Sequence, residues 1–481
     1  MANHDCLPED LHPDLEPLAV LLPDWDDPEA AEEEFRSDFF RGMAGRRSKA
    51  AFVLMAIWGV VIALHLVHWG FALVLILTGV AALLSLRMLI AQPAIAPKLL
   101  SEADFAQAPR VSLLVAAKNE EAVIGRLVRR LCNLDYPGDR YEVWVVDDAS
   151  TDATPTILQR LAAEHAQLKV VRRLPGASGG KSGALNQVLP RVQGEIVGVF
   201  DADATVPADL LRRIVPYFEP PTVGALQMRK AIANASDNFW TKGQAAEMYL
   251  DAYWQQQRVA VGGIGELRGN GQFVRRTALE SCGRWNEQTI TDDLDLTIRL
   301  HLDGWDIAVC PQPAVGEEGV TTTSSLWHQR NRWAEGGYQR YLDYWRWLAR
   351  NRLGWSKSLD VAFFIVNQYV LPTAAIPDVG MALLRQQSPL LYPLSGTIFA
   401  FAMTGMFISL YRQHCQSRFW LAAAWRALMQ TLRGAIYMIH WLVVMPCTTG
   451  RMSIRPKRLK WVKTTHQGGG EDLEPSYTEL G

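Results

Sequence analysis

The chain has 481 residues, of which 49% are hydrophobic and only 20% are charged, and its formal net charge is −2. The net charge by itself says nothing about nucleic acid, and no nucleic-acid partner is expected. The charged fraction is low for an entirely soluble enzyme. The six cysteines are scattered singly, which excludes a paired metal-ligand spacing and indicates free thiols in a reducing compartment.

The N-terminal part is predicted to be a cytosolic arm followed by a membrane hairpin. Residues 1–49 are polar and acidic, which is the opposite of a signal peptide. From Ala50 to Leu86 no Lys, Arg, Asp or Glu occurs, and a run of this length accommodates two membrane helices. We therefore predict a transmembrane hairpin over residues 50–93, with a buried core hairpin as the alternative. Basic residues flank both ends of the run, which favours a cytoplasmic position for both.

Residues 105–335 are predicted to form one α/β domain with a mostly parallel sheet. Apolar strands are expected at residues 111–115, 141–146, 168–172 and 196–200, with helices at residues 122–134 and 154–164 between them. Strands that alternate with helices are typical of parallel sheets. In such sheets ligands bind at the carboxyl ends of the strands.

Two acidic motifs fall at those strand ends. Asp147 and Asp148 follow one strand, and one of these carboxylates could accept hydrogen bonds from a nucleoside. Asp201 and Asp203 follow another strand and could hold Mg²⁺ or Mn²⁺ against a diphosphate. The alternatives are helix capping by the residues after the first pair and a solvated turn for the second motif.

Two further turns are candidates for nucleotide contact. The polar turn at residues 118–121 follows the first strand, and a glycine-rich turn at residues 179–186 opens a helix. The amides of the second turn and the side chain of Lys181 could meet phosphates. Because the full P-loop spacing is missing, no ATP site is indicated, and a flexible surface loop is the alternative.

Asp293 is the candidate general base. A hydroxyl acceptor must lose its proton as it attacks the sugar, and a positioned carboxylate can take that proton. Asp292 and Asp295 flank this residue and are the competing choices. A helix is expected at residues 294–302, so stabilisation of the helix N-terminus is the alternative explanation for the acidic cluster.

Gln329, Arg332 and Trp333 lie at positions i, i+3 and i+4, so they share one face of a helix. Arg332 could hold a diphosphate electrostatically, and Trp333 could stack beside the acceptor. The alternative is an interfacial or core face. Residues 336–358, rich in Trp, Tyr and Arg, are then predicted to form an interfacial helix, or else a surface helix of the soluble domain.

Residues 359–450 are predicted to contain further transmembrane or interfacial helices. Residues 361–384 and 390–411 are expected to cross the membrane, which gives four spans together with the hairpin. Residues 419–445 are ambiguous because two arginines interrupt the apolar run. Residues 451–481 are basic and then polar, and they are predicted to be a cytosolic tail.

In this order, the motifs around Asp148, Asp201, Asp293 and Arg332 resemble those of family 2 glycosyltransferases with a GT-A fold. That family includes cellulose, chitin and hyaluronan synthases and ceramide glucosyltransferase. The resemblance covers residues 110–338, and it implies a UDP-sugar-dependent hexosyltransferase that inverts the anomeric centre of its donor.

The resemblance also implies roles for individual residues. The resemblance implies nucleotide contact by Asp147 or Asp148 and metal binding by Asp201 and Asp203. It implies that Asp293 is the general base. Gln329, Arg332 and Trp333 match the QxxRW motif of the family. One departure is Asp292, because the family usually has glutamate there. Residues 269–272 resemble the segment that lines the acceptor site in the family.

Within the family, the layout is most similar to that of membrane lipid glucosyltransferases. This similarity implies UDP-glucose as donor, the free hydroxyl of 1,2-diacylglycerol as acceptor, Mg²⁺ or Mn²⁺ as cofactor and the lipid bilayer as partner. The catalytic domain of such a multi-pass membrane protein would face the cytoplasm. The alternatives are a processive β-polysaccharide synthase of the cellulose or hyaluronan type, a ceramide-type glucosyltransferase, and a non-enzymatic membrane scaffold.

Overall fold

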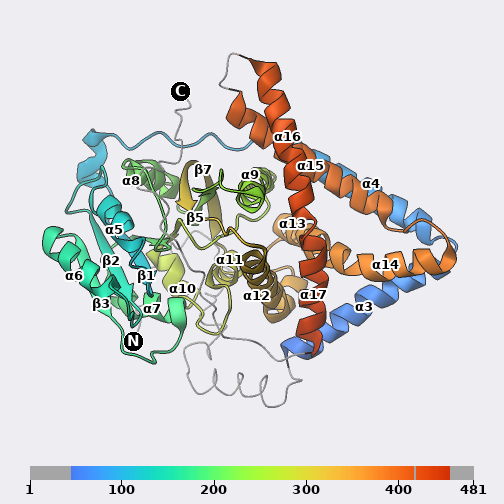
Figure 1. The fold of residues 1–481 in the computed structure, drawn as a ribbon, viewed down its shortest axis with the longest axis horizontal. Coiled ribbons are helices and arrows are strands. Elements are labelled where there is room, and N and C mark those ends of the chain that lie inside the picture. Colours follow the sequence, from blue (N-terminus) through green and yellow to red (C-terminus); the bar gives the residue numbers. More distant parts are fainter. Residues whose placement is uncertain (1–44, 416–418, 455–481) are drawn as a thin grey trace.

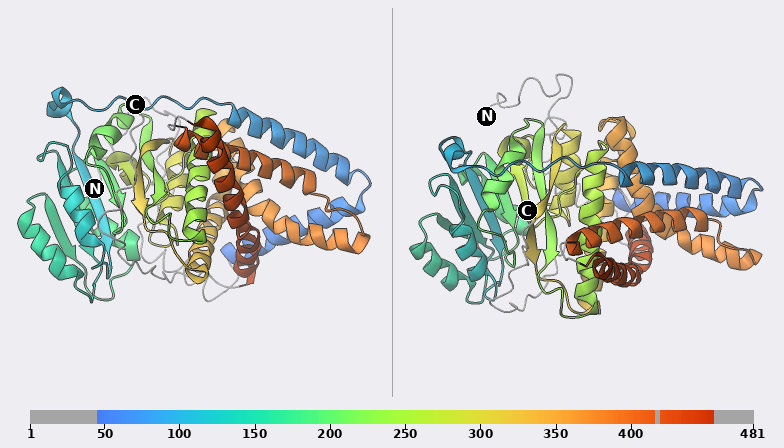
Figure 2. Two further views of the ribbon diagram at one scale, coloured as in Figure 1. Left: turned by 45° about the horizontal axis from the view of Figure 1, so that its top comes forward. Right: turned by 90° about the horizontal axis from the view of Figure 1, so that it is seen from above.

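The computed structural model describes residues 45–415 and 419–454, so most of the predicted N-terminal arm and C-terminal tail lies outside the described residues. An α/β domain forms one side of the molecule, and long helices project from its other side (Figure 1). Two further views show the same division, with the helices extending away from the sheet (Figure 2).

The α/β domain is built on one seven-stranded sheet with the order β3-β2-β1-β4-β6-β5-β7. The strands are β1 (Val111–Ala117), β2 (Tyr141–Asp147), β3 (Leu168–Arg172), β4 (Ile196–Phe200), β5 (Val223–Ile232), β6 (Gln272–Arg275) and β7 (Asp306–Glu317). Only β6 runs antiparallel, against both β4 and β5, and the other pairs are parallel. The predicted mostly parallel α/β architecture is therefore confirmed.

The sheet separates two hydrophobic cores, because consecutive side chains of a strand point to opposite faces. In β1, Leu113 belongs to one core and Leu114 to the other, and in β2 Val145 and Trp144 divide in the same way. The helices of the domain are α5 (Ile124–Cys132), α6 (Thr154–Glu164), α7 (Gly180–Val188), α8 (Leu210–Ile214), α9 (Phe239–Ala260), α10 (Arg276–Ser281) and α11 (Asp292–Leu302). This burial on both faces explains why the strands read as continuous apolar runs.

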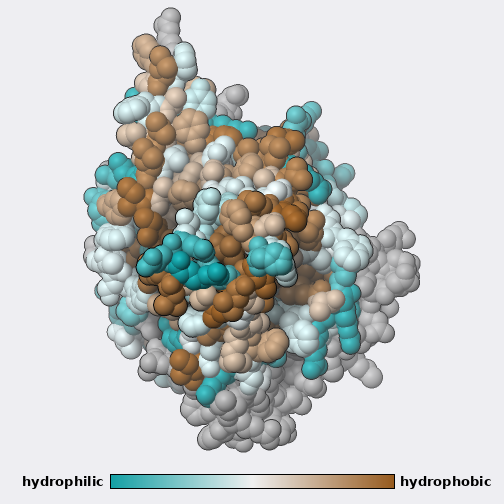
Figure 3. Space-filling view, turned by 90° about the vertical axis from the view of Figure 1, so that its right-hand side faces the viewer, coloured by the Kyte–Doolittle hydropathy of each residue, from teal (hydrophilic) through white to brown (hydrophobic). Residues whose placement is uncertain are grey.

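In the described residues, five helical segments are long and apolar enough to cross a membrane, which supports a membrane protein. They comprise α3 (Arg46–Leu66), α4 (Gly70–Leu89), α13 to α14 (Trp355–Ile365 and Leu371–Arg385, joined by the π-helical turn Val366–Val370), α15 (Tyr392–His414), and α16 with α17 (Trp420–Met438 and Trp441–Ile454). Apolar side chains are prominent on the face that these helices present (Figure 3).

The first two of these helices form the expected hairpin, with the turn between Leu66 and Gly70. A buried polar pair joins the hairpin to α14: His65 Nε2 lies 2.8 Å from Asp378 Oδ1. The carboxylate of Asp378 also accepts hydrogen bonds from the backbone N–H groups of Leu390 and Leu391. Pairing of this kind satisfies ionisable groups that would be costly if left alone among apolar helices.

The segment predicted to be an interfacial helix, residues 336–358, begins within α12 (Thr323–Ala349), and several of its aromatic side chains are buried. Tyr338, Tyr341 and Tyr344 are buried inside the protein, and Tyr338 stacks on Tyr369 of the π-helical turn with ring centroids 5.4 Å apart. The reason is that the π-helical turn and α17 cover this part of α12. Aromatic side chains suit a buried contact as well as a headgroup layer.

The ambiguous stretch at residues 419–445 forms α16 and the beginning of α17, with a break between Met438 and Trp441. Together the two helices qualify as a fifth candidate span by length and composition. The N-terminal helix of this pair packs against both α9 and α15. The membrane helices are thereby tied directly to the α/β domain.

Candidate active site

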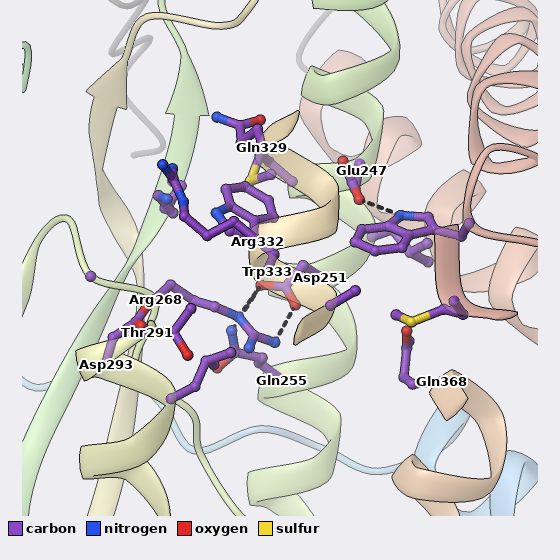
Figure 4. Close-up of a pocket in the computed structure, with 18 of the residues that line it drawn as sticks. Glu247, Asp251, Gln255, Arg268, Thr291, Asp293, Gln329, Arg332, Trp333 and Gln368 are labelled. Carbon is purple, nitrogen blue, oxygen red and sulfur yellow. Dashed lines mark hydrogen bonds and ion pairs between the residues drawn. The ribbon is translucent and has the colours of Figure 1, made fainter. Parts of the chain in front are cut away.

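One cavity of about 1270 Å³ collects almost all of the motif residues. Its walls come from the carboxyl ends of β1, β2 and β4, from α9, α11 and α12, and from the membrane helices α14 to α17. Figure 4 shows part of this space, with Asp293 on one side and Gln368 of the π-helical turn on the other. A single cavity therefore runs from the polar strand ends to apolar helices.

The two aspartates of the first motif have different surroundings. Asp147 is 1% exposed, and its Oδ1 accepts a hydrogen bond of 3.0 Å from the backbone N–H of Ser150, which fixes the turn after β2. Asp148 lines the cavity, and its Oδ1 lies 2.8 Å from Arg173 Nη1. Lys118 approaches the other oxygen of Asp148 to 3.5 Å. Of the two carboxylates, only that of Asp148 belongs to the lining of the cavity.

Asp201 and Asp203 line the cavity beyond the end of β4. Asp201 Oδ1 lies 2.6 Å from Lys181 Nζ, and Asp203 Oδ2 accepts a 2.8 Å hydrogen bond from the backbone N–H of Glu318. Burial opposes the charge of Lys181, but the carboxylates of Asp201 and Asp292 outweigh it and raise the pKa of the lysine. Lys181 therefore stays positively charged beside Asp201, which is a candidate metal ligand.

The acid side chains here fit a magnesium-type or manganese-type ion that is shared with a substrate. Among the described residues, no group of three or more His, Cys, Asp and Glu side chains forms a complete metal cage. Mg²⁺ is usually bound through one or two carboxylates together with substrate phosphates. Asp201 and Asp203 supply that number of carboxylates at the cavity wall.

Asp293 lies in the first turn of α11 and lines the cavity. Burial and the neighbouring charge of Asp292 raise the pKa of Asp293 to about 6, which brings the carboxyl close to neutral pH. Gly269 allows a close approach, since a Cβ atom at this positive-φ position would lie 3.3 Å from Asp293 Oδ2. The sequence segment 269–272 therefore does reach the candidate base.

Of the two acids that compete with Asp293 for the role of general base, one does not line the cavity. Asp295 is buried away from the cavity, where its Oδ2 lies 2.8 Å from Arg299 Nε and its Oδ1 accepts a 3.0 Å hydrogen bond from the hydroxyl of Tyr344. Its role is to hold α11 against α12. Asp292 lines the cavity like Asp293.

Gln329, Arg332 and Trp333 share the face of α12 that lines the cavity, as the i, i+3 and i+4 spacing predicts. Burial lowers the pKa of Arg332, against the opposing effect of nearby carboxylates, and the guanidinium still remains charged at neutral pH. Lys230 lies over the ring of Trp333 at 5.4 Å from its centroid. Arg330 points elsewhere, into a buried ion pair with Glu247.

Several cavity residues were missed by sequence reasoning. Glu247, Asp251 and Gln255 line the cavity from α9, and Arg268 lines it from the loop before β6 (Figure 4). The three α9 residues lie at i, i+4 and i+8, so a polar stripe on an otherwise mixed helix was an available signal. No local pattern marks Arg268, whose position depends on the tertiary fold.

The membrane half of the cavity has a different lining. Phe363, Phe399, Met403, Met438 and Leu442 are contributed by four membrane helices, and they make this part predominantly apolar. Apolar walls of this kind favour hydrocarbon over a hydrated ligand. The chemistry of the cavity thus changes from charged groups at the sheet to apolar groups at the membrane helices.

Comparison with known proteins agrees with these features. Residues 109–336 match the family model described as "Glycosyltransferase like family 2". The chain is 61% identical over 464 residues to the β-monoglucosyldiacylglycerol synthase of Synechocystis sp., which covers 95% of this chain and 96% of that protein. The synthase of the same name from Nostoc sp. is 57% identical over 463 residues, covering 96% of this chain and 98% of the relative.

Among solved structures, the mannosyltransferase PcManGT of Pyrobaculum calidifontis, in complex with GDP-Man and Mn²⁺, is similar with a TM-score of 0.48 and 25% identity. The likeness covers 78% of this chain and 99% of that one.

The mostly parallel sheet, the acidic motifs at its strand ends and the family match define a GT-A glycosyltransferase of family 2. Within that class, the identity over nearly the whole length shows that the chain belongs to the family of the β-monoglucosyldiacylglycerol synthases.

Proposed function

We propose that this enzyme transfers glucose from UDP-glucose to the free hydroxyl of 1,2-diacylglycerol and forms β-monoglucosyldiacylglycerol. The observation that carries the proposal is the single cavity that joins Asp201 and Asp293 to the apolar membrane helices. A sugar nucleotide is charged and water-soluble, whereas diacylglycerol is neutral and almost wholly apolar. A cavity with one charged and one apolar half suits both substrates at once.

The charged half is proposed to bind the donor. Asp148 would accept hydrogen bonds from the nucleoside, and Lys181 and Arg332 would hold the diphosphate; all three residues line the cavity. Asp201 and Asp203 would hold Mg²⁺ or Mn²⁺, which when bound neutralises charge on the departing UDP. Cations that surround a diphosphate stabilise the charge that develops as the sugar–phosphate bond breaks.

Asp293 is proposed to act as the general base. As its carboxylate takes the proton from the acceptor hydroxyl, the acceptor oxygen forms a bond to the anomeric carbon of glucose. The bond from that carbon to the diphosphate breaks on the opposite face, and UDP leaves with the bonding electrons. A single displacement of this kind inverts an α-linked donor into a β-glycoside. A pKa of about 6 leaves Asp293 mostly ionised at pH 7, as a base requires.

The domain is proposed to face the cytoplasm, where both ends of the membrane hairpin would lie. Arg46 and Arg87 are at the ends of α3 and α4 nearest to the domain, and both contact it. Arg46 pairs with Asp343 of α12, and Arg87 Nη2 donates a 3.1 Å hydrogen bond to the carbonyl of Val261. Basic residues on the domain side of the helices agree with the positive-inside rule.

A radiolabelled transfer assay tests the proposed function. Purified full-length protein is incubated in detergent with labelled UDP-glucose, dioleoylglycerol and Mg²⁺, and the lipids are extracted and separated. The proposal expects one labelled glycolipid in the organic phase. Label found only in ethanol-insoluble polymer would overturn it in favour of a polysaccharide synthase, and label found only with added ceramide would overturn the choice of acceptor.

A further inference from the structure

A network of largely buried charges surrounds Glu266, and most of its members line the cavity. Glu266 is 0% exposed and is shared by three arginines: its oxygens lie 2.7 Å from Arg340 Nη2, 2.9 Å from Arg268 Nη2 and 3.3 Å from Arg258 Nη1. Three arginines around a single carboxylate would leave excess positive charge in a buried place. Further carboxylates balance this excess.

Asp251 and Asp360 supply the balance. Asp251 Oδ1 lies 2.7 Å from Arg268 Nη2, and Asp360 Oδ2 lies 2.9 Å from Arg258 Nη2. Three guanidinium groups are therefore matched by three carboxylates within the protein. Because the network is already neutral, it has no electrostatic demand for an anionic ligand such as a phosphate. A neutral ligand that accepts hydrogen bonds suits it better.

Arg340 keeps Nε and Nη1 without hydrogen-bond partners among the described residues, but both atoms are fully buried. Arg268 is the member of this network whose remaining group is accessible to such a ligand. Its Nε and Nη2 are held by Asp251, and Nη2 also meets Glu266. No residue in the described parts of the chain accepts a hydrogen bond from its Nη1, and the residue lines the cavity with its side chain 20% exposed. A guanidinium whose orientation is fixed on one edge presents the other edge at low entropic cost.

Arg268 is also close to the candidate base. It directly precedes Gly269, whose Cα faces the carboxylate of Asp293, and Figure 4 shows Arg268 between Asp293 and the α9 helix. Burial opposes the charge of Arg268, but the carboxylates of Asp251, Glu266 and Asp293 raise its pKa and keep it cationic. A hydrogen-bond donor at this position would contact the part of the acceptor lipid that lies next to its reacting hydroxyl.

In diacylglycerol, the groups next to the hydroxyl are the ester carbonyls of the glycerol backbone, which only accept hydrogen bonds. We propose that Arg268, held by Asp251, recognises the acceptor lipid. Its Nη1 donates a hydrogen bond to an ester carbonyl and thereby orients the free hydroxyl toward Asp293. This inference rests on the proposed function and names the feature of the acceptor that the site recognises. Arg268 acts as a specificity-determining residue that contacts the substrate.

The ester carbonyl can be removed from the acceptor without changing its chains. We would measure kcat/KM of the full-length enzyme in detergent with 1,2-dioleoylglycerol and with its ether analogue 1,2-di-O-oleylglycerol. A hydrogen bond from a charged donor predicts that the wild type prefers the ester by about tenfold or more. Arg268→Gln should lose that preference, because its rate falls on the ester and stays nearly unchanged on the ether.

Arg276→Gln is the matched control, since Arg276 pairs with Glu280 on the surface outside the cavity. It should keep the full ester preference. Arg268→Lys covers the case in which the glutamine variant fails to fold. It keeps the positive charge beside Asp251 but loses the forked geometry of the guanidinium group, so the preference for the ester over the ether should still fall. Folding is checked by KM for UDP-glucose and by thermal unfolding in detergent.

Equal loss on both acceptors, or a wild type without ester preference, would overturn the role of Arg268. An unchanged preference in Arg268→Lys would overturn it as well. These outcomes differ from failure of the proposed function. A wild-type enzyme that transfers glucose to neither lipid would refute diacylglycerol as the acceptor, whatever the variants do.

Discussion

Replacing Asp292 with asparagine is expected to move the acidic limb of the pH–rate profile to lower pH. The pKa of Asp293 is about 6 because burial and the charge of Asp292 both disfavour its ionised form. Since the base must be ionised, kcat/KM should be flat above pH 7 and should fall as the pH drops through 6. At pH 5 roughly one tenth of Asp293 is ionised, so kcat/KM should be about tenfold below its plateau.

Asp292→Asn removes the like charge next to Asp293, so the pKa of the base falls and the variant should keep more of its plateau rate at pH 5. The assay is kcat/KM for labelled UDP-glucose from pH 4.5 to 8, at fixed dioleoylglycerol and Mg²⁺. Asp139→Asn is the control, because Asp139 is exposed and outside the cavity. A limb that does not move would refute the electrostatic argument, and loss of transfer at every pH would make Asp292 the base.

Three other expectations concern the donor, the metal and the buried pair. Asp148→Asn should raise KM for UDP-glucose about tenfold, whereas Asp147→Asn should mainly lower the unfolding temperature; steady-state kinetics and a melting curve separate the two. EDTA should abolish transfer and added Mg²⁺ or Mn²⁺ should restore it, and transfer that survives EDTA would contradict the role of the DxD motif. Glu247→Leu should destabilise the protein by about 3–5 kcal/mol because Arg330 stays buried without its partner, and unchanged thermal unfolding in detergent would disprove this.

The sheet and its acidic motifs could be predicted from the sequence because their signals are local. The strands that end at Asp147 and at Phe200 are short apolar runs, and their positions agree within two residues with β2 and β4. The motif residues follow those strands directly, so parallel pairing alone brings them to one edge. The antiparallel β6 has no comparable signal, since its four residues depend on partners far away in the sequence.

The sequence could not distinguish residues of the same type that have different surroundings in the fold. Asp147 and Asp148 are adjacent acids, yet the turn buries the first and the cavity exposes the second. The tyrosines of α12 match the composition of an interfacial helix, but α17 and the π-helical turn cover them. Arg268 lies in the loop before β6, and Asp251 of α9 holds its side chain at the cavity wall. Each difference is decided by tertiary contacts that no local pattern records.

NMR and mass analysis of the lipid product that the purified enzyme makes from UDP-glucose and dioleoylglycerol tests the proposed β-glucosylation of diacylglycerol most directly. We expect one glucose per lipid, β-linked through the free hydroxyl of the glycerol, with the product lowered at least about 100-fold in Asp293→Asn. An α-linked product, a chain of several sugars, or near-normal product from Asp293→Asn would contradict it.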